Sequence, residues 1–547
     1  MGTRIHLYAL PGLPIRLEDL TPQPLLARCA GALSARGHVA RIYDAGSLAC
    51  LDQPETRALA HMIAESGAGP WPRHFPGGLG RIARALRQHR AARVRRVVAE
   101  ECERPCPAVI VIQIGRQKDV PEARALAAAL RERRPQSVIV VVGAFVNAFA
   151  RPLLAAAGEF DAACTGPAES VLAGLVRSRR DRSSWDRIPG LVYRRGASVA
   201  AGSARMRPLE PDFAPAAYHP RVYPALLHAG KIKLFTLQHS TGLRHAGHYR
   251  GEWARRPVHV REARQLRAEM LYLFELYGAR AFHIAGPHTP REAALELAHE
   301  CATLPFELVY ARDGHVLETD GELLRALVRS GCRVIRFGLL TGSQRLLSDY
   351  YGEDWTVSEV EACMRMCRAH GMRRHVSFVY PCPEDDRHTA AETIRMIQRC
   401  QPDSACFSLP ELAPGSVWFQ HARACGFGMP GGRLARWVGG HGVAAEVAGR
   451  PPVRPFTMRG LWGRALAQQI RSLSSEIERR GIPIESGGAS CLLSEVDPGA
   501  SGLGGLLARL DLDPLHATID SYNGRATASI DTLDLSPPAR MREAVGN

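Results

Sequence analysis

The sequence predicts an α/β protein in which a doubly wound, Rossmann-like domain precedes a partial (β/α)6 barrel and a small C-terminal α+β region. Three observations predict this class. Ala108–Gly115 and Val138–Gly143 are continuous apolar runs, typical of strands buried on both faces of a parallel sheet. The chain opens with a strand–helix–strand unit. Between residues 232 and 409, six apolar runs alternate with helical patterns, as they do in a barrel of βα units.

The N-terminal unit consists of a predicted strand, a helix and a second strand. In Arg4–Leu10 polar and apolar residues alternate, and a Pro-Gly pair follows. This pattern predicts a strand that ends in a loop. Leu20–Ala35 is a helical pattern stopped by a glycine, and His38–Tyr43 is the next strand. Two strands joined in this way are parallel, with a right-handed crossover. Residues 51–107 then predict a mainly helical, arginine-rich insertion without a functional signal.

A ligand site is predicted where the strands of this first sheet end, because ligands of doubly wound sheets bind outside the carboxyl ends of the strands. Glycines at these ends allow a flat ligand to approach the backbone closely. They are also the residues of ordinary turns. The candidate residues are Gly115, Arg116, Gly143, Ala144, Gly166 and Glu169.

The barrel is predicted to begin with a strand at Ile232–Leu237. A Gly- and His-rich loop follows, and a helical pattern then runs from about Arg261 to Tyr277. The chemistry of such barrels lies at the C-terminal ends of the strands. The other five strands are predicted at Ala281–Gly286, Phe306–Ala311, Val334–Leu340, His375–Tyr380 and Cys406–Leu409.

This order of elements resembles the radical S-adenosylmethionine (radical SAM) enzymes of the branch that carries an N-terminal cobalamin-binding domain. The opening strand, proline loop and helix, the connector Ile188–Tyr193 (IPGLVY) and the six βα units carry the resemblance. It implies that cobalamin is a cofactor, bound at the strand ends named above. It also implies a division into a cobalamin-binding domain (1–185), a linker (186–224), a radical-SAM-like barrel (225–430) and a C-terminal region (431–547).

The chain departs from that family at its defining motif. In the family, the loop after the first barrel strand carries three cysteines whose thiolates hold a 4Fe–4S cluster. Aligned on Ser240-Thr241-Gly242, these positions hold Leu243, Gly247 and Arg250. At the end of the fourth barrel strand, Leu340 stands where the family has an acid that contacts SAM. We therefore expect no bound 4Fe–4S cluster and no reductive cleavage of SAM.

Histidines near the predicted strand ends offer a replacement site. His239, His245 and His248 follow the first barrel strand and His283 lies in the second. Imidazoles can bind zinc or iron(II), or act as general acids and bases near pH 7. The alternative is a polar loop with solvated histidines. No acidic residue completes an obvious ligand set, so the prediction names these four as candidate acid–base residues and assigns no metal.

The composition limits the kinds of partner and site that we expect. The net charge is +16, but the arginines are dispersed and do not form a stripe with interleaved aromatics, so we expect no nucleic-acid partner. The fourteen cysteines include no paired C-x-x-C motifs, which argues against a zinc ribbon. No apolar run is long enough for a membrane span, and the N-terminus opens directly into a strand, so we expect a cytoplasmic protein.

The C-terminal region gives structural signals only. Arg464–Arg480 predicts an amphipathic helix that ends at a glycine. His516–Thr532 predicts a β-hairpin with Asn523-Gly524 as its type I′ turn.

Three hypotheses follow for the function. The first is a cobalamin-dependent tailoring enzyme of a biosynthetic pathway that transfers a methyl group to a small molecule or peptide without cleaving SAM. The second is a non-catalytic subunit that binds cobalamin or substrate beside an active partner enzyme. The third is a radical SAM enzyme with unusual cluster ligands.

Overall fold

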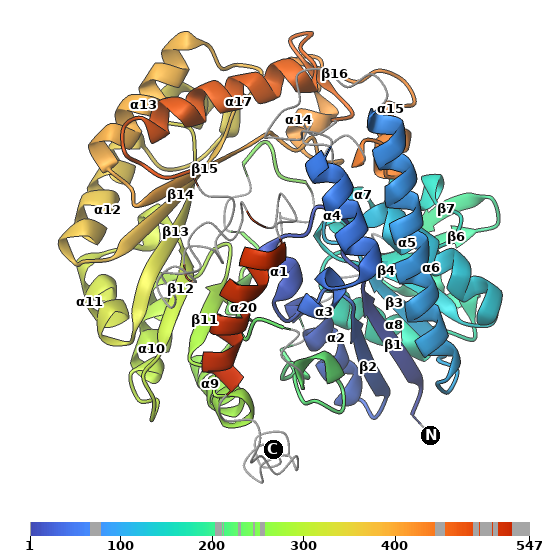
Figure 1. The fold of residues 1–547 in the computed structure, drawn as a ribbon. Coiled ribbons are helices and arrows are strands. Elements are labelled where there is room, and N and C mark those ends of the chain that lie inside the picture. The colour runs from blue at the N-terminus through green and yellow to red at the C-terminus, as the bar shows by residue number, and fades with distance from the viewer. Residues whose placement is uncertain are drawn as a thin grey trace.

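The fold was analysed in a computed structural model, which describes residues 2–65, 78–202, 211, 213–227, 231–243, 247–251, 257–443, 454–484, 492, 506 and 512–527. Two β-sheets dominate these residues. The N-terminal half forms a seven-stranded sheet and the following part a six-stranded parallel sheet, each covered by helices (Figure 1).

The N-terminal sheet has the order β2-β1-β3-β4-β5-β6-β7, with β1 to β5 parallel. The order turns around between β1 and β3, so their carboxyl ends form the topological switch point. Valine and isoleucine fill its central strands because both faces are buried. The strands are β1 (Arg4–Ala9), β2 (Val39–Asp44), β3 (Val109–Gln113), β4 (Val138–Val142), β5 (Ala162–Cys164), β6 (Leu191–Arg195) and β7 (Ser198–Ala201).

Helices cover both faces of this sheet, as expected for a doubly wound fold. On one face, α2 (Pro24–Ser34) packs beside α8 (Ala168–Ser178). The other face carries α5 (Gly78–Cys102), α6 (Val120–Arg133) and α7 (Ala144–Ala156). The short helices α1 (Leu17–Leu20) and α3 (Leu48–Leu51) follow β1 and β2, and α4 (Pro54–Glu65) packs on α5.

The predicted linker 186–224 is partly wrong. Leu191–Arg195 and Ser198–Ala201 form β6 and β7, which extend the sheet antiparallel to β5. The apolar residues of β6 are buried, since Leu191, Val192 and Tyr193 are at most 6% exposed. The first sheet therefore continues to Ala201, because a hairpin that buries its apolar residues covers the edge that β5 would otherwise expose.

The second sheet is the predicted partial barrel. Its order is β8-β11-β12-β13-β14-β15, all parallel, and its outer helices alternate with the strands along the chain (Figure 1). The strands are β8 (Phe235–Gln238), β11 (Ala281–Ala285), β12 (Val309–Gly314), β13 (Cys332–Leu340), β14 (Arg373–Val379) and β15 (Ser404–Ser408). The helices are α9 (Ala263–Tyr277), α10 (Arg291–Cys301), α11 (Gly321–Arg329), α12 (Val357–Ala369) and α13 (Arg387–Cys400).

The last strand of this sheet is covered by a C-terminal segment. Helix α17 (Gly463–Glu478) matches the predicted amphipathic helix and leads to Pro483 and Ile484. The amide of Ala405 in β15 donates to the carbonyl of Pro483 at 2.9 Å, and Ala405 forms a parallel bridge with Ile484. The smaller elements of this region are α14 (Val417–Gln420), α15 (Arg433–Val438), β16 (Phe427–Gly428) and β17 (Thr457–Met458).

Helix α20 (Leu512–Thr527) lies between the two sheets (Figure 1). The predicted hairpin at His516–Thr532 is therefore wrong as far as residue 527; residues 528–532 lie outside the described residues. Leu512, Leu515 and Ile519 recur at helical spacing and are buried, so tertiary packing overrides the local Asn-Gly turn signal.

The same apolar cluster joins the two halves of the chain. Leu515 and Ile519 of α20 meet Leu13 and Ile15, which belong to the loop after β1. The cluster continues into the second sheet, where it includes one residue each of β11, β12 and β13: Ala281, Ala311 and Val334. The inner face of the barrel is therefore closed at this level by the N-terminal sheet's own loop and by α20.

A buried ion pair lies at the same junction. The ammonium of Lys231, just before β8, lies 2.7 Å from the carboxylate of Asp44 at the end of β2, and both side chains are fully buried. The Lys231 ammonium also donates to the carbonyls of Asp19 and Thr21 at 2.9 and 3.2 Å. One lysine thus connects the first barrel strand to two loops of the N-terminal sheet.

None of the helices in the described part of the chain combines the length and the apolar character that crossing a membrane requires.

Candidate functional site

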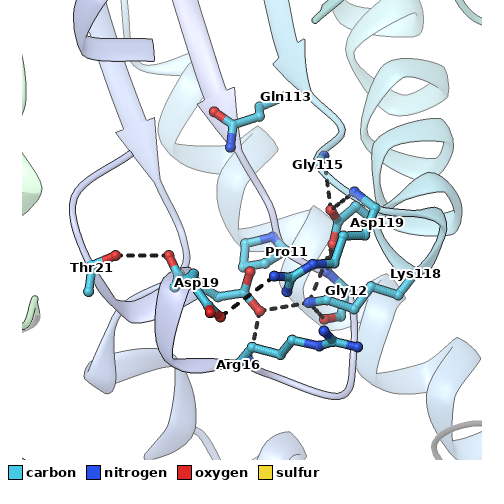
Figure 2. Close-up of polar contacts among 12 residues, drawn as sticks. Pro11, Gly12, Arg16, Asp19, Thr21, Gln113, Gly115, Lys118 and Asp119 are labelled. Atoms are coloured by element: carbon cyan, nitrogen blue, oxygen red, sulfur yellow. Dashed lines mark hydrogen bonds and ion pairs between the residues drawn. The ribbon is translucent and has the colours of Figure 1, made fainter. Parts of the chain in front are cut away.

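The site begins at the switch point, where the loops after β1 and β3 meet (Figure 2). The carboxylate of Asp119 accepts hydrogen bonds from three backbone amides. Gly12 in the loop after β1 donates at 2.9 Å, and Gly115 and Arg116 after β3 donate at 3.1 and 2.9 Å. Two loops that are far apart in sequence are therefore joined by one buried side chain.

Lys118 completes this contact. Its ammonium is 3% exposed, lies 2.6 Å from the Asp19 carboxylate and donates to the carbonyl of Gly12 at 2.7 Å (Figure 2). Burial alone would raise the pKa of Asp19, but the charge and hydrogen bond of Lys118 hold it below its usual value. Because Asp19, Lys118 and Asp119 all have partners, the two loops at this edge of the sheet are preorganised.

The predicted ligand residues on β3, β4 and β5 do lie at this carboxyl edge. Gly115 leaves open space, since a Cβ built there would meet only the Asp119 carboxylate, at 3.5 Å. Gly143 has a φ of +129°, and a Cβ there would lie 2.3 Å from the Ile114 carbonyl, so no larger residue fits. Ala144, the first residue of α7, is exposed, and the Gly166 amide donates to Asn147 at 2.7 Å.

Two of the predicted residues are placed differently. Arg116 is 38% exposed and pairs with Glu18 at 3.6 Å, so its side chain turns toward the loop after β1. Glu169 is buried under the sheet, and its carboxylate lies 3.8 Å from Arg28 on α2. Glu169 therefore joins α8 to α2 rather than presenting a carboxylate at the edge.

These residues fit a corrinoid, which the family resemblance implies. A corrinoid is a flat macrocycle with carboxamide groups around its rim. The open backbone at Gly115 and the exposed Ala144 leave room for such a ring. The carbonyl oxygen of the Gln113 side chain, at the end of β3, is buried and has no hydrogen-bond partner in the part of the chain that the structure describes, although the amide of the same side chain donates to Gln23 at 2.8 Å. An unpaired buried acceptor at this edge suits a carboxamide donor.

A polar layer lies on the inner face of the barrel. His283, Asp313 and Arg336 each follow by two residues a member of the apolar cluster at the barrel floor, so they share its face. Arg336 donates to His283 Nε2 at 2.9 Å and lies 3.1 Å from Asp313, which is 3.5 Å from His283. Burial would raise the pKa of Asp313, but Arg336, His283 and the Gly286 amide hold it well below its usual range.

The layer continues on β14. His375 is in register with Arg336, and its Nδ1 lies 2.8 Å from the hydroxyl of Ser404. Burial and the Arg336 charge lower the pKa of His375 to about 4, so it is neutral at pH 7. The Nε of Arg336 is buried and has no hydrogen-bond partner among the described residues. Arg336 thus retains a donor for a ligand acceptor.

Of this layer, only His283 was predicted from the sequence. Asp313, Arg336 and His375 were not among the predicted site residues, which were chosen at the strand ends. Neither β12, β13 nor β14 places its charged residues at every second position, so the sequence does not indicate which of them face the inside of the barrel.

Three of the four predicted histidines lie in the described residues, where His239, His248 and His283 each have separate surroundings. His239 is 1% exposed, and neither of its ring nitrogens has a hydrogen-bond partner among the described residues. Burial, with the charges of Arg312 and Arg261, lowers its pKa to about 3. His248 contacts the carbonyl of Tyr350 at 3.2 Å. His245 lies outside the described residues. Within the part of the chain that is described, no three His, Cys, Asp or Glu side chains form a group that would hold a metal.

The three cluster positions have other contacts. At Gly247 a Cβ would lie 3.0 Å from the Tyr351 carbonyl and 2.9 Å from the Tyr249 ring, so the chain passes too close for a larger residue. Arg250 donates to the Tyr249 hydroxyl at 2.9 Å. Leu243 offers no donor atom. The donors at these positions therefore do not fit iron, and no step is derived through a 4Fe–4S cluster.

Leu340, at the position of the family's SAM-contacting acid, has a φ of +63°. A branched residue rarely adopts this left-handed conformation, which costs of order 1–3 kcal/mol. The register of β13 against β14 shifts just before it, and Leu340 is buried. The strand end is thus bent and apolar at the place where the family has a carboxylate.

Comparison with solved structures shows which proteins share this fold. TsrM from Kitasatospora setae, a radical S-adenosylmethionine methyltransferase solved with cobalamin and a 4Fe–4S cluster, matches with a TM-score of 0.63 at 15% identity, over 96% of this chain and 100% of that chain. OxsB, a cobalamin-dependent S-adenosylmethionine radical enzyme solved with aqua-cobalamin, matches with a TM-score of 0.51 at 11% identity, over 77% of this chain and 55% of that chain. The predicted fold class is confirmed.

Sequence comparison points in the same direction. An anaerobic magnesium-protoporphyrin IX monomethyl ester cyclase of Cereibacter sphaeroides is 23% identical over 304 residues, which are 53% of this chain and 49% of that protein. A cyclase of the same name from Synechocystis sp. is 20% identical over 306 residues, 54% of this chain and 61% of that protein. The chain thus spans about half the length of the first of these relatives. No protein-family model matches the chain.

Proposed function

We propose, from a fold shared with cobalamin-dependent radical SAM enzymes, that this chain is a corrinoid-binding tailoring enzyme. The observation that carries the proposal is the open, preorganised edge at Gly115 and Gly143. The loop after β1 belongs to that edge and packs against the floor of the barrel through Leu13 and Ile15. A ligand at the edge would therefore lie beside the polar layer of His283, Asp313, Arg336 and His375.

A corrinoid supplies methyl transfer through its cobalt when bound. The chain would hold it through Gly115, Gly143 and Ala144 and through the unpaired oxygen of Gln113. The Asp119 network would keep both loops in place as the ring enters. Because the Asp119 carboxylate already accepts three amides, these loops need no ordering on binding, which reduces the entropic cost.

The substrate would lie in the barrel, with an acceptor group on the free Nε of Arg336. Neutral His375 can take the proton that a substrate N–H or C–H loses when a methyl group replaces it. Its Nδ1 is already occupied by Ser404, so Nε2 is the atom that would accept. Asp313 fixes the Arg336 guanidinium from the other side.

The corrinoid part of the proposal is tested by titrating the purified protein with hydroxocobalamin and following the corrinoid absorption that stays with the protein after gel filtration. The variant is Gly115→Leu, whose side chain would enter the open space at the edge without a strained φ. The matched control is Gly158→Leu, because Gly158 also has open space around it but lies on an exposed loop away from the edge.

We expect stoichiometric binding in the wild type and in Gly158→Leu, and a loss of at least about tenfold in affinity in Gly115→Leu, equivalent to about 1.4 kcal/mol. Absence of retained corrinoid in the wild type, with the far-ultraviolet spectrum of a folded protein, would refute the proposal. Equal binding by all three proteins would place the corrinoid elsewhere.

A second candidate function is a non-catalytic subunit, and the closed contacts of Gly247 and the apolar Leu340 favour it. It predicts that the chain binds corrinoid but gives no methylated product unless a partner enzyme is added. Product formed by the isolated chain, and lost in Arg336→Met, would reject it. Analysis of iron and sulfide in anaerobically prepared protein tests the expectation that no cluster is bound.

A further inference from the structure

A cavity lies between β2 and α5, at the carboxyl ends of β1 and β2, and its lining does not include Gly115 or Gly143. Its volume is about 270 Å³. Tyr8 and Tyr43 form an aromatic wall, α5 forms the opposite wall, and the connector to the barrel closes one end at Pro224 and Ala225. Nothing in the proposed function uses this cavity.

Arginine dominates the charge around the cavity. Four arginines line it against two acids, and the acids are already engaged. Asp44 is held by Lys231, and Glu100 lies 3.4 Å from Arg104. The arginines are Arg41, Arg93, Arg96 and Arg104.

Two of these arginines form no ion pair with a carboxylate among the described residues. Arg41 is exposed, and no carboxylate lies within ion-pair distance of it among the described residues. Arg93 is 4% exposed and donates to two backbone carbonyls, those of Pro11 at 2.8 Å and Ala45 at 3.4 Å, again without a described carboxylate partner. The Arg93 guanidinium thus makes its hydrogen bonds to carbonyls, and the buried Glu122 carboxylate offsets part of its charge from a longer distance.

The aromatic wall supplies a flat apolar surface. The rings of Tyr43 and Tyr8 are stacked with centroids 5.0 Å apart, and the Arg104 guanidinium lies 4.2 Å from the Tyr43 centroid. The Tyr43 hydroxyl is buried, and its hydrogen-bonding side chain among the described residues is Arg104. The Tyr43 hydroxyl, the guanidinium of Arg41 and the guanidinium of Arg104, which the exposed Glu100 holds, together present donors to an anionic acceptor.

We propose that this cavity binds a small organic anion with a flat apolar body and a phosphate or carboxylate head. Arg41 and Arg104 would hold the head, the Tyr43 hydroxyl would donate to it, and the body would lie against the apolar lining between Val97 and Ala225. The anion would touch β2, α5 and the connector to β8 at once, and so would stabilise the contact between the two halves of the chain.

The experiment uses calorimetric titration of the full chain with three probes. Phenyl phosphate carries both features, inorganic phosphate lacks the ring, and phenol lacks the charge. Phenylacetate, the anion of phenylacetic acid, is a fourth probe and tests a carboxylate head. The variants are Arg41→Ala, which removes an exposed side chain, and Arg104→Ala. The matched control is Arg84→Ala, an exposed arginine of α5 that does not line the cavity.

We expect a one-to-one complex with phenyl phosphate or phenylacetate that is tighter than with inorganic phosphate or phenol. Arg41→Ala and Arg104→Ala should each weaken it about tenfold, the usual effect of losing one charge-assisted hydrogen bond, and Arg84→Ala should not change it. If Arg104→Ala fails to fold, Arg41→Ala decides alone. No heat with either anionic probe, or an equal loss in Arg84→Ala, would overturn the proposal.

Discussion

At the scale of single residues, three buried histidines give the protein a dependence on pH. Burial is the main cause that lowers the pKa of His89 and His239 to about 3 and that of His375 to about 4. Nearby arginines lower each of them further. All three are neutral in the folded protein near pH 7, and all three would protonate near pH 6.5 in the unfolded chain.

We predict that the stability is lost as the pH falls. Above pH 6.5 neither state binds the extra protons. Between pH 6.5 and about 4 the unfolded state binds up to three protons that the folded state does not, so the free energy of unfolding falls with pH. In His239→Phe, the slope of the free energy of unfolding against pH should decrease by about 1.4 kcal/mol per pH unit, which corresponds to one proton. Urea denaturation at several pH values measures this slope.

The control is His388→Phe, because His388 is exposed on α13 and should leave the slope unchanged. An equal slope in His239→Phe and the wild type would show that His239 is protonated in the folded protein.

The residues of the sheet edge were predictable and those of the barrel layer were not. Glycine at the end of an apolar run marks a turn at the carboxyl edge, so Gly115 and Gly143 follow from local sequence. Asp313 and Arg336 depend on which face of a strand is turned inward, and a strand of the second sheet buries both faces. Only the register of neighbouring strands, which the sequence does not contain, decides that their side chains meet.

At the scale of elements, the Asp119 network determines the geometry of two loops. We predict that Asp119→Ala destabilises the protein by about 1–3 kcal/mol, because one buried and two partly buried backbone amides lose the carboxylate that accepts from them. The comparison variant is Asp181→Ala, whose exposed carboxylate accepts from the Ser183 amide at 3.0 Å. It should have much less effect on the urea midpoint. Equal midpoints for the two variants would contradict the assignment.

Helix α20 is an element that local sequence describes wrongly. Its Asn-Gly pair is a strong hairpin signal. The apolar residues before that pair, however, recur at helical spacing, and they pack against residues that are distant in sequence. The strands of the barrel and its first helix, α9, were predicted within a few residues, since apolar runs and turns mark each of them in the local sequence. The elements β6, β7 and α20 were not predicted, because they depend on contacts with residues that are distant in sequence.

For α20 we predict that Leu515→Ala destabilises the protein by about 2–5 kcal/mol, the usual range for a fully buried leucine. Ser521→Ala, on the exposed side of the same helix, should change the unfolding midpoint little. Limited proteolysis provides a second measurement: cleavage within residues 512–527 should be faster in Leu515→Ala than in Ser521→Ala. Equal cleavage would mean that α20 is not held by this contact.

At the scale of the whole molecule, the two sheets are joined by the apolar cluster and by Lys231. We predict that Lys231→Met costs about 3–5 kcal/mol, because it leaves the Asp44 carboxylate buried without its cation. The double variant Lys231→Met/Asp44→Leu should regain part of this loss, since neither charge then remains. Arg57→Ala breaks an exposed pair with Asp52 and serves as the control. A double variant no better than the single one would refute this account.

The bridge between Ala405 and Ile484 has a consequence for self-association. A terminal strand with unpaired amides can recruit a strand from another molecule, and such recruitment begins sheet-to-sheet aggregation. Here the returning chain after α17 occupies the outer side of β15, and Pro483 contributes a carbonyl to the ladder but no amide of its own. The C-terminal region thus protects the colloidal solubility of the barrel, whatever else it contributes.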